Sequence, residues 1–309
     1  MLSAPVVLII FNRPDLTKQS FSAIRDVQPE NLVIIADGPR ETVVSDEQKC
    51  LQARKETEKI NWPCNVRRIY ADTNMGLKRR VVSGLTEVFR NAPCAIVIED
   101  DCVLHRDYFT FSQELLLMYS EYPQVWSITA DNFQEGKRFG RDSYYFSKYS
   151  HCWGWATWRR TWQAFDPDIN FWPSLKTTKL WCTIHTDLRE RRYWESIMDA
   201  CYAGQIDSWA YPWMLNMWFS GGLTATPQVN LATNIGFGAS ATHTHNSDRR
   251  FEMMRAQLGP LSHPTRISPR KDADKRVFQN VFQTRPEKRK MLLYRLRSRL
   301  RHAFSQSKT

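Results

Sequence analysis

The 309-residue chain lacks the sequence patterns of a membrane or secreted protein. No run approaches the ~18 apolar residues that a membrane-spanning helix needs. The apolar stretch at residues 6–11 is too short for the core of a signal peptide and has no basic residues before it. The seven cysteines are scattered and form no CxxC pair, and an odd number fits a reducing compartment. We therefore expect a cytoplasmic protein.

Two nucleotide-binding signatures are also missing, the phosphate loop GxxxxGKS/T and the dinucleotide fingerprint GxGxxG. The positive charge is local. The formal net charge is +11, and residues 266–309 hold 14 Lys/Arg against three Asp/Glu, whereas residues 1–265 hold 29 of each. A neutral body with a basic tail argues against a specific nucleic-acid partner, although the tail alone can bind phosphate nonspecifically.

The most informative stretch is residues 94–102, in which five apolar residues run directly into Glu99, Asp100 and Asp101. A short continuous apolar run is typical of a strand that is buried on both faces of a parallel sheet. Open α/β sheets bind ligands at the carboxyl ends of such strands. Adjacent carboxylates raise each other's pKa unless a cation lies among them, and Mg²⁺ or Mn²⁺ prefers oxygen ligands. The stretch therefore predicts a divalent-metal site, with an exposed acidic turn as the alternative.

The first third of the chain alternates apolar strands with amphipathic helices. Pro14 suits the first turn of a helix, and Ser45 with Gln48 forms a capping-box pattern. We expect strands at residues 5–11, 31–36, 66–71 and from 94, with helices from 14, at 45–60 and at 76–91. This order predicts an α/β fold, with a mostly parallel sheet flanked by helices.

The middle of the chain is rich in tryptophan, because eleven of the twelve tryptophans lie between Trp126 and Trp218. Most of these rings are expected in the core, and we expect Trp153 or Trp155 to serve as an apolar platform for a sugar. Asp207 precedes an aromatic helix at residues 209–219, where it is either a helix cap or a functional carboxylate. A loop of small residues at 234–245 ends in two histidines, which are either surface residues or metal ligands.

Seven short motifs occur in an order that resembles one family. They are FNRP, ADG, NMGL, EDD, CWGWATW, IDSWA and NIGF. Over residues 4–246 the chain resembles the bacterial GT-A glycosyltransferases of the family-2-like, hemolysin-related group. More distantly, it is similar to the Golgi N-acetylglucosaminyltransferase that starts complex N-glycans. The resemblance implies a GT-A (Rossmann-like) domain at 1–265, with a nucleotide-binding half at 1–130, an acceptor half at 131–265 and a basic helical tail at 266–309.

The resemblance also implies a set of donor-binding residues. Arg13 would contact the nucleotide base or the diphosphate, and Asp37 would accept a hydrogen bond from a uracil imide. Glu99 would face the donor sugar, and Asp100 the ribose. Asn74 and Gly76 would form the turn near the nucleoside, and Lys78 or Arg79 would be free to contact phosphate.

For catalysis, the resemblance implies that Asp101 ligates Mn²⁺ or Mg²⁺, with His243 as a second ligand, and that Asp207 is the general base. The expected reaction is inverting transfer of a sugar from a nucleotide-diphosphate donor, a UDP-sugar, to a hydroxyl of a glycan or lipid-linked acceptor. A non-catalytic sugar-nucleotide binder and a sugar nucleotidyltransferase are the alternatives. The intact acidic triplet argues against the first, and the lack of a Gly-rich basic signature after the first strand argues against the second.

Residues 285–304 read as a basic helix with one apolar face. Such a helix either packs on the body or lies on an anionic membrane surface. The second reading suits a lipid-linked acceptor and predicts a peripheral protein of the inner membrane.

Overall fold

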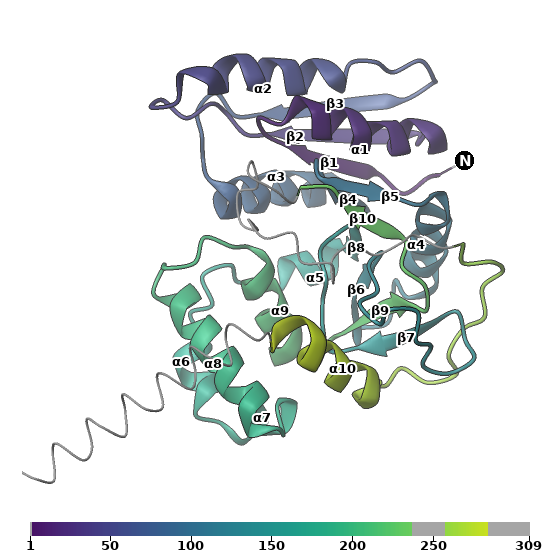
Figure 1. The fold of residues 1–309 in the computed structure, drawn as a ribbon, viewed down its shortest axis with the longest axis vertical. Coiled ribbons are helices and arrows are strands. Elements are labelled where there is room, and N and C mark those ends of the chain that lie inside the picture. The colour runs from purple at the N-terminus through teal and green to yellow at the C-terminus, as the bar shows by residue number, and fades with distance from the viewer. Residues whose placement is uncertain (1, 237–256, 284–309) are drawn as a thin grey trace, which may run out of the picture.

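The computed structural model describes residues 2–236 and 257–283, and it has an α/β fold around one eight-stranded sheet (Figure 1). The strand order is β3-β2-β1-β4-β8-β6-β9-β7. Strands β1 to β4 are mutually parallel. Strand β8 lies antiparallel between β4 and β6, so that β6 and its parallel neighbour β9 point the same way as β4. Only β7 and β8 run in the opposite direction within this sheet. The predicted fold class is confirmed.

The first half of the sheet consists of β1 (Val6–Ile10), β2 (Asn31–Ala36), β3 (Asn65–Tyr70) and β4 (Cys94–Glu99). The second half consists of β6 (Val125–Thr129), β7 (Tyr144–Ser147), β8 (Trp155–Trp158) and β9 (Leu223–Pro227). A separate two-stranded sheet pairs β5 (Cys102–Leu104) with β10 (Ala232–Asn234).

The longer helices are α1 (Pro14–Val27), α2 (Val44–Glu56), α3 (Leu77–Asn91), α4 (Arg106–Met118), α8 (Leu188–Tyr202) and α9 (Ala210–Phe219). The shorter ones are α5 (Arg159–Gln163), α6 (Trp172–Lys176), α7 (Lys179–Ile184), α10 (Lys271–Val277) and the π-helical turn η2 (Phe278–Phe282). Within the described residues, no helix has the length and apolar character to cross a membrane.

The central strands are buried on both faces, which is why they read as continuous apolar runs. Alternate residues of β1 enter opposite cores. Val6 and Leu8 pack with Phe21 of α1, in the core that α2 and α4 also cover. Val7 packs with Leu85 of α3, in the core that α5, α8 and α9 complete. The sheet is therefore fixed between two helical layers, and its strand ends are held in register.

The predicted strands and helices of the first third are found within a few residues, but the capping box is wrong. Helix α2 begins at Val44, and no side chain caps it. Asp46 in its first turn is fully buried instead, where it accepts hydrogen bonds from Asn12 Nδ2 at 2.7 Å and from Arg40 Nε at 2.5 Å. The contacts of the buried Asp46 carboxylate with Asn12 and the part-exposed Arg40, not the Ser45 hydroxyl, fix the start of the helix.

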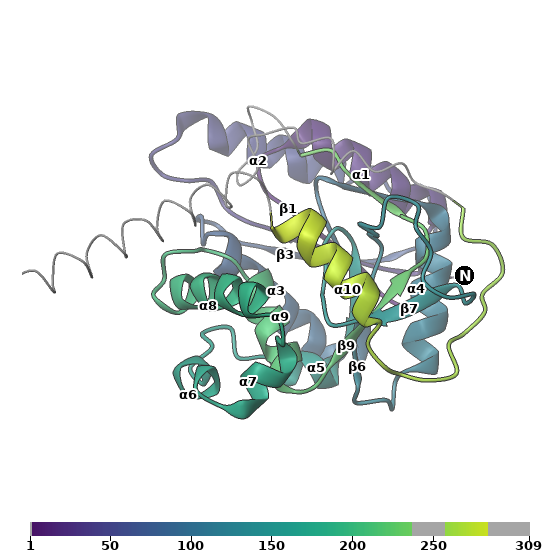
Figure 2. The same cartoon turned by 60° about the horizontal axis from the view of Figure 1, so that its bottom comes forward.

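The packed body continues past residue 265, where we expected the tail to begin. Helix α10 lies between β7 and α8, as Figure 2 shows. Its buried Asp274 accepts a hydrogen bond from Ser147 Oγ at 2.6 Å, and Phe278 of η2 contacts the ring of Tyr193 on α8. The apolar residues Ala273 and Val277 share one face of α10, so this segment is part of the core. The predicted basic helix at 285–304 lies outside the described residues.

Candidate active site

The carboxyl ends of β1, β2 and β4 lie at one edge of the sheet, because these strands are parallel and adjacent. This edge carries Arg13 after β1, Asp37 after β2, and Glu99 to Asp101 at the end of β4. The loop after the parallel strand β3 reaches the same edge. The fold therefore gathers the donor-side residues that the sequence predicts.

Arg13 holds two of the three acidic residues. Its Nη1 lies 3.1 Å from Asp101 Oδ2, and its Nη2 donates to Asp100 Oδ1. Asp100 is buried and also accepts the backbone N–H of Phe11 at 3.3 Å. Burial raises the pKa of Asp100 to about 6, although the charge of Arg13 opposes the shift. Burial alone would lower the pKa of Arg13, but the two carboxylates raise it above its ordinary value. Arg13 therefore keeps its positive charge. We call the group formed by Arg13, Glu99, Asp100 and Asp101 the acidic corner.

Glu99 differs from its two neighbours. Burial, followed by the charges of Asp101 and Asp100, raises the pKa of Glu99 to about 8, although the indole N–H of Trp209 donates to the carboxylate. At neutral pH the Glu99 carboxyl is therefore mostly protonated, and it can donate as well as accept a hydrogen bond. With Glu99 neutral, the corner holds two carboxylates against one guanidinium.

Asp37 ties together the loops that follow β2 and β3. Its Oδ1 accepts the backbone N–H groups of Gly38 and Met75, each at 2.9 Å, and its Oδ2 accepts Asn74 Nδ2 at 3.0 Å. Burial raises the pKa of Asp37, while the Met75 and Gly38 N–H groups oppose that shift. Gly38 is required by space, since a Cβ there would lie 2.5 Å from the backbone of Thr73. The roles of Asp37 and Asn74 toward a nucleoside remain predictions.

Asp207 lies at the N-terminus of α3. Its Oδ1 is 3.4 Å from the backbone N of Lys78, and a Cβ on Gly76, whose φ is +80°, would be 3.4 Å from its Oδ2. The expectation that Asp207 caps its own following helix is wrong, because α9 begins at Ala210. The carboxylate instead faces the positive end of a helix from the other half of the chain.

The two basic residues after Gly76 are placed differently. Lys78 Nζ forms an ion pair with Asp168 Oδ1 at 2.8 Å, and Arg79 is exposed to solvent. Both lie in the first turn of α3, next to the carboxylate of Asp207. Contact of either side chain with phosphate remains a prediction.

The two candidate sugar platforms lie in different environments. Trp155 is 1% exposed and stacks on Trp209 with ring centroids 5.0 Å apart, so it is a core residue in this structure. Trp153 is half-buried and packs edge-on against Phe133 at 5.1 Å. Gly154, with φ +83°, lets this loop pack closely on Leu104. A Cβ on residue 154 would lie only 2.5 Å from Leu104 Cδ2. Trp153 is the candidate that retains exposed surface.

Asp131 is a residue of this edge that the sequence analysis did not single out. It follows β6, is fully buried, and accepts hydrogen bonds from Thr129 Oγ1 and the backbone N–H of Trp153. Its Oδ2 has no partner among the described residues, and burial raises its pKa to about 7. An acid directly after a short apolar strand is the signal that could have identified it. Asp131 holds the loop that carries Trp153.

The segment after β10 lies directly against Asp101. The backbone N of Ile235 donates to the Asp101 carbonyl at 2.8 Å. A Cβ on Gly236 would lie only 2.4 Å from Asp101 Oδ2, so only glycine permits this approach. The small residues of this loop are predicted to lie close to a bound substrate. In the structure, Gly236 lies close to Asp101, the candidate metal ligand. His243 lies outside the described residues.

Asp101 is the predicted metal ligand whose position the structure describes. Among the residues that the structure describes, no three His, Cys, Asp or Glu side chains are placed to hold a metal ion. Mg²⁺ commonly uses one or two carboxylates and completes its shell with phosphate oxygens and water. Asp101, part exposed at the sheet edge, supplies a carboxylate for that mode of binding.

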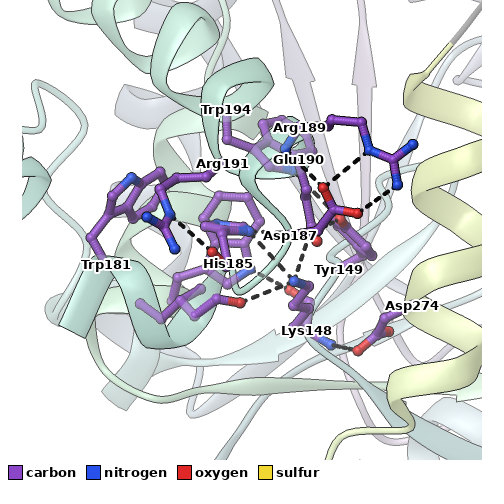
Figure 3. Close-up of polar contacts among 12 residues, drawn as sticks. Lys148, Tyr149, Trp181, His185, Asp187, Arg189, Glu190, Arg191, Trp194 and Asp274 are labelled. Atoms are coloured by element: carbon purple, nitrogen blue, oxygen red, sulfur yellow. Dashed lines mark hydrogen bonds and ion pairs between the residues drawn. The ribbon is translucent and has the colours of Figure 1, made fainter. Parts of the chain in front are cut away.

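A second polar cluster lies away from this edge and holds α8 in place (Figure 3). Lys148 Nζ is 2.5 Å from Glu190 Oε1, which also interacts with His185 Nδ1 at 3.1 Å and with the hydroxyl of Tyr149. Burial lowers the pKa of His185 to about 4, so its neutral ring donates to Glu190. Burial would raise the pKa of Glu190, but its hydrogen bond with His185 and the charge of Lys148 lower it. The cluster joins the strand end after β7 to the start of α8, whose other end leads into the Asp207 loop.

No protein-family model and no curated protein match the chain. Solved structures with a similar fold include TarS from S. aureus, at 8% identity and a TM-score of 0.42, over 74% of this chain. The chain spans 59% of that TarS chain. They also include the mannosyltransferase PcManGT from Pyrobaculum calidifontis in complex with GDP-Man and Mn²⁺, at 10% identity and a TM-score of 0.38, over 71% of this chain and 70% of that one. A UDP-glucose pyrophosphorylase complexed with UDP-glucose matches at 11% identity and a TM-score of 0.31, over 52% of this chain and 78% of that one. Likeness at this level assigns no activity to the chain.

Proposed function

We propose that the chain is a metal-dependent inverting glycosyltransferase, which moves a sugar from a nucleotide-diphosphate donor, a UDP-sugar, to a hydroxyl of a glycan or lipid-linked acceptor. Asp207 is the general base, Asp101 is a ligand of Mn²⁺ or Mg²⁺, and Arg13, Asp37 and Asp100 belong to the donor site.

One observation carries the proposal. The loop that holds Asp207 is fixed to the donor-side half at two points. Asp207 Oδ1 lies 3.4 Å from the backbone N of Lys78, and the indole of Trp209, two residues later, is near enough to the Glu99 carboxyl to oppose the rise of its pKa. These contacts support the proposal, because they bring the loop of Asp207, from the second half of the sequence, to the sheet edge at which Glu99 ends β4. A base that acts on an acceptor hydroxyl at the donor sugar requires this juxtaposition.

The residues have distinct roles in the proposed reaction. Asp207 takes the proton of the acceptor hydroxyl as that oxygen attacks the anomeric carbon from the face opposite the leaving group. The protonated Glu99 carboxyl donates a hydrogen bond to a hydroxyl of the donor sugar. Arg13, Lys78 and Arg79 supply positive charge for the diphosphate. When bound at Asp101, a divalent cation supplies Lewis-acid stabilisation of the leaving diphosphate.

A panel of nucleotide sugars tests the proposal with the full-length chain. We expect Mn²⁺-dependent release of UDP from one UDP-sugar, abolished by excess EDTA and restored by Mn²⁺. NMR of the early product is expected to show an inverted anomeric configuration. Pyrophosphate release from a nucleoside triphosphate and a sugar phosphate would identify a nucleotidyltransferase instead. Binding of a UDP-sugar with no turnover toward water or any glycan acceptor would identify a non-catalytic binder.

A further inference from the structure

We infer that Arg13 is a built-in cation that occupies the carboxylate of Asp101 until a nucleotide diphosphate arrives, so that the free protein binds divalent metal weakly and binds metal and nucleotide synergistically. The inference rests on the proposed function, because it assigns an order of events to the same site.

The geometry of the corner motivates this inference. The two arms of the Arg13 guanidinium span two acids, with Nη2 on Asp100 and Nη1 on Asp101 at 3.1 Å. Gly236 lies against the same Oδ2 of Asp101 that Nη1 contacts, and Cys102 Sγ lies 3.3 Å from Oδ1. Both oxygens of Asp101 therefore have neighbours in this structure, and a cation approaching Oδ2 meets the positive charge of Arg13.

The two arms of Arg13 are not equivalent. The Asp100 side chain is 3% exposed and also accepts the N–H of Phe11, whereas the Asp101 side chain is 15% exposed. We therefore expect Arg13 to give up its contact with Asp101 and to keep its contact with the more buried Asp100. The Arg13 side chain is 21% exposed, so its free edge is accessible to an incoming ligand.

A diphosphate resolves the conflict between the two cations. Phosphate oxygens match the planar fork of a guanidinium as well as a carboxylate does, so Arg13 can exchange Asp101 for phosphate without losing its hydrogen bonds. The same diphosphate adds negative charge and supplies the further oxygens that a metal needs. Release of Asp101 and arrival of the metal are thereby coupled to nucleotide binding, and the coupling must be reciprocal.

The test measures Mn²⁺ binding by titration calorimetry and electron paramagnetic resonance, with and without UDP, and does not depend on turnover. For the wild type we expect weak binding without UDP and at least about tenfold tighter binding with it, a coupling within the ordinary allosteric range. In Arg13→Met we expect Mn²⁺ affinity without UDP to rise several-fold and the gain from UDP to fall. Arg25→Met, on the helix α1 that follows Arg13, is the matched control and should behave as the wild type.

Each outcome bears on one of the two proposals. Unchanged or weaker Mn²⁺ binding by Arg13→Met without UDP overturns the inference. If that variant does not fold, as judged by circular dichroism, Arg13→Gln replaces it. A glutamine keeps hydrogen-bond donors for the acids but carries no positive charge, so Mn²⁺ affinity without UDP should again rise, and an unchanged value overturns the inference. If the wild type binds no Mn²⁺ even with UDP, or if Asp101→Asn binds it equally well, the metal role in the proposed function fails instead.

Discussion

The pKa values of individual residues at the candidate site depend on burial as much as on neighbouring charges. Burial is the largest influence on the pKa values of Asp100, Glu99 and Asp131, which rise to about 6, 8 and 7. In contrast, Asp207 lies in a loop at the N-terminus of α3, where it meets a backbone N–H. Burial thus keeps Glu99 mostly and Asp131 partly protonated near neutral pH, whereas Asp100 is mostly ionised beside Arg13.

The first prediction concerns the proposed base. Asp207→Asn keeps the shape of the side chain and removes its basicity, so kcat is expected to fall by about 10²–10⁴. The affinity for the UDP-sugar, measured by calorimetry, should change little. Asp168→Asn removes a nearby carboxylate that is 71% exposed, and it should retain activity close to that of the wild type. Full turnover by Asp207→Asn would remove this residue from the mechanism.

The second prediction concerns pH and Asp131. Its pKa is raised by burial from 3.8 to about 7, so the folded state holds a proton that the unfolded state has lost between these values. The contribution of Asp131 to stability is therefore greatest at low pH and decreases as the pH rises toward 7. Asp131→Asn removes this dependence. Relative to the wild type, the variant should gain about 2–3 kcal/mol in unfolding free energy between pH 5 and pH 8.

Chemical denaturation at the two pH values measures this difference. Asp15→Asn, at an exposed carboxylate on α1, controls for the change in net charge. A constant difference between Asp131→Asn and the wild type across the two pH values would contradict the prediction.

Residues at strand ends could be predicted from the sequence, but their tertiary partners could not. Arg13, Asp37 and Asp101 follow short apolar runs, and parallel strands bring such positions to one edge. The contact of Asp207 with Lys78 joins positions 129 residues apart, and no local pattern encodes it. Trp153 and Trp155 likewise look alike in sequence, and only the packing of Trp155 on Trp209 separates them.

At the scale of elements, the helices and strands of the first half of the chain could be predicted from the sequence, and those of the second half could not. Strands β1, β2 and β4 read as continuous apolar runs because they are buried on both faces. The short helices α5, α6 and α7 lie in an aromatic-rich stretch with no clear period, and they are defined by tertiary contacts. Within this stretch, the Lys148 cluster fixes the start of α8.

The third prediction compares two ion pairs of α8. Removing one partner of a buried pair leaves the other charge uncompensated, so Lys148→Met should lower the unfolding free energy by about 3 kcal/mol. Lys176→Met breaks the more exposed pair with Asp199 and should cost less than about 1 kcal/mol. The double variant Lys148→Met/Glu190→Leu should recover part of the loss. A loss below about 1 kcal/mol for Lys148→Met, measured by denaturant titration, would contradict the prediction that the cluster stabilises the fold.

At the scale of the molecule, the positive charge is concentrated at the C-terminal end of the sequence. The described body ends at residue 283, shortly after the aromatic residues of η2 pack against α8. Residues 284–309 lie outside the described part, and by sequence they hold nine Lys/Arg and one Asp/Glu, a net charge of +8. Because the excess charge of the whole chain is +11, most of it belongs to this terminal segment.

The fourth prediction tests the proposed membrane surface. A chain truncated after residue 283 should no longer sediment with vesicles that contain anionic lipid, because each basic residue near such a surface contributes about 1 kcal/mol. The full-length chain should bind these vesicles and dissociate from them at high salt. It should not bind vesicles of neutral lipid. The truncated chain should keep its thermal stability, since η2 remains intact. Undiminished vesicle binding after truncation would rule out the membrane role of this segment.

The pairing of β5 with β10 has a consequence for biosynthesis. Asn234 pairs with Cys102, and Gly236 then lies against Asp101, so one wall of the acidic corner comes from a segment translated more than a hundred codons later. The residues of β1 to β4 are synthesised before residue 236, so a nascent chain cannot complete the acidic corner until this later segment has left the ribosome.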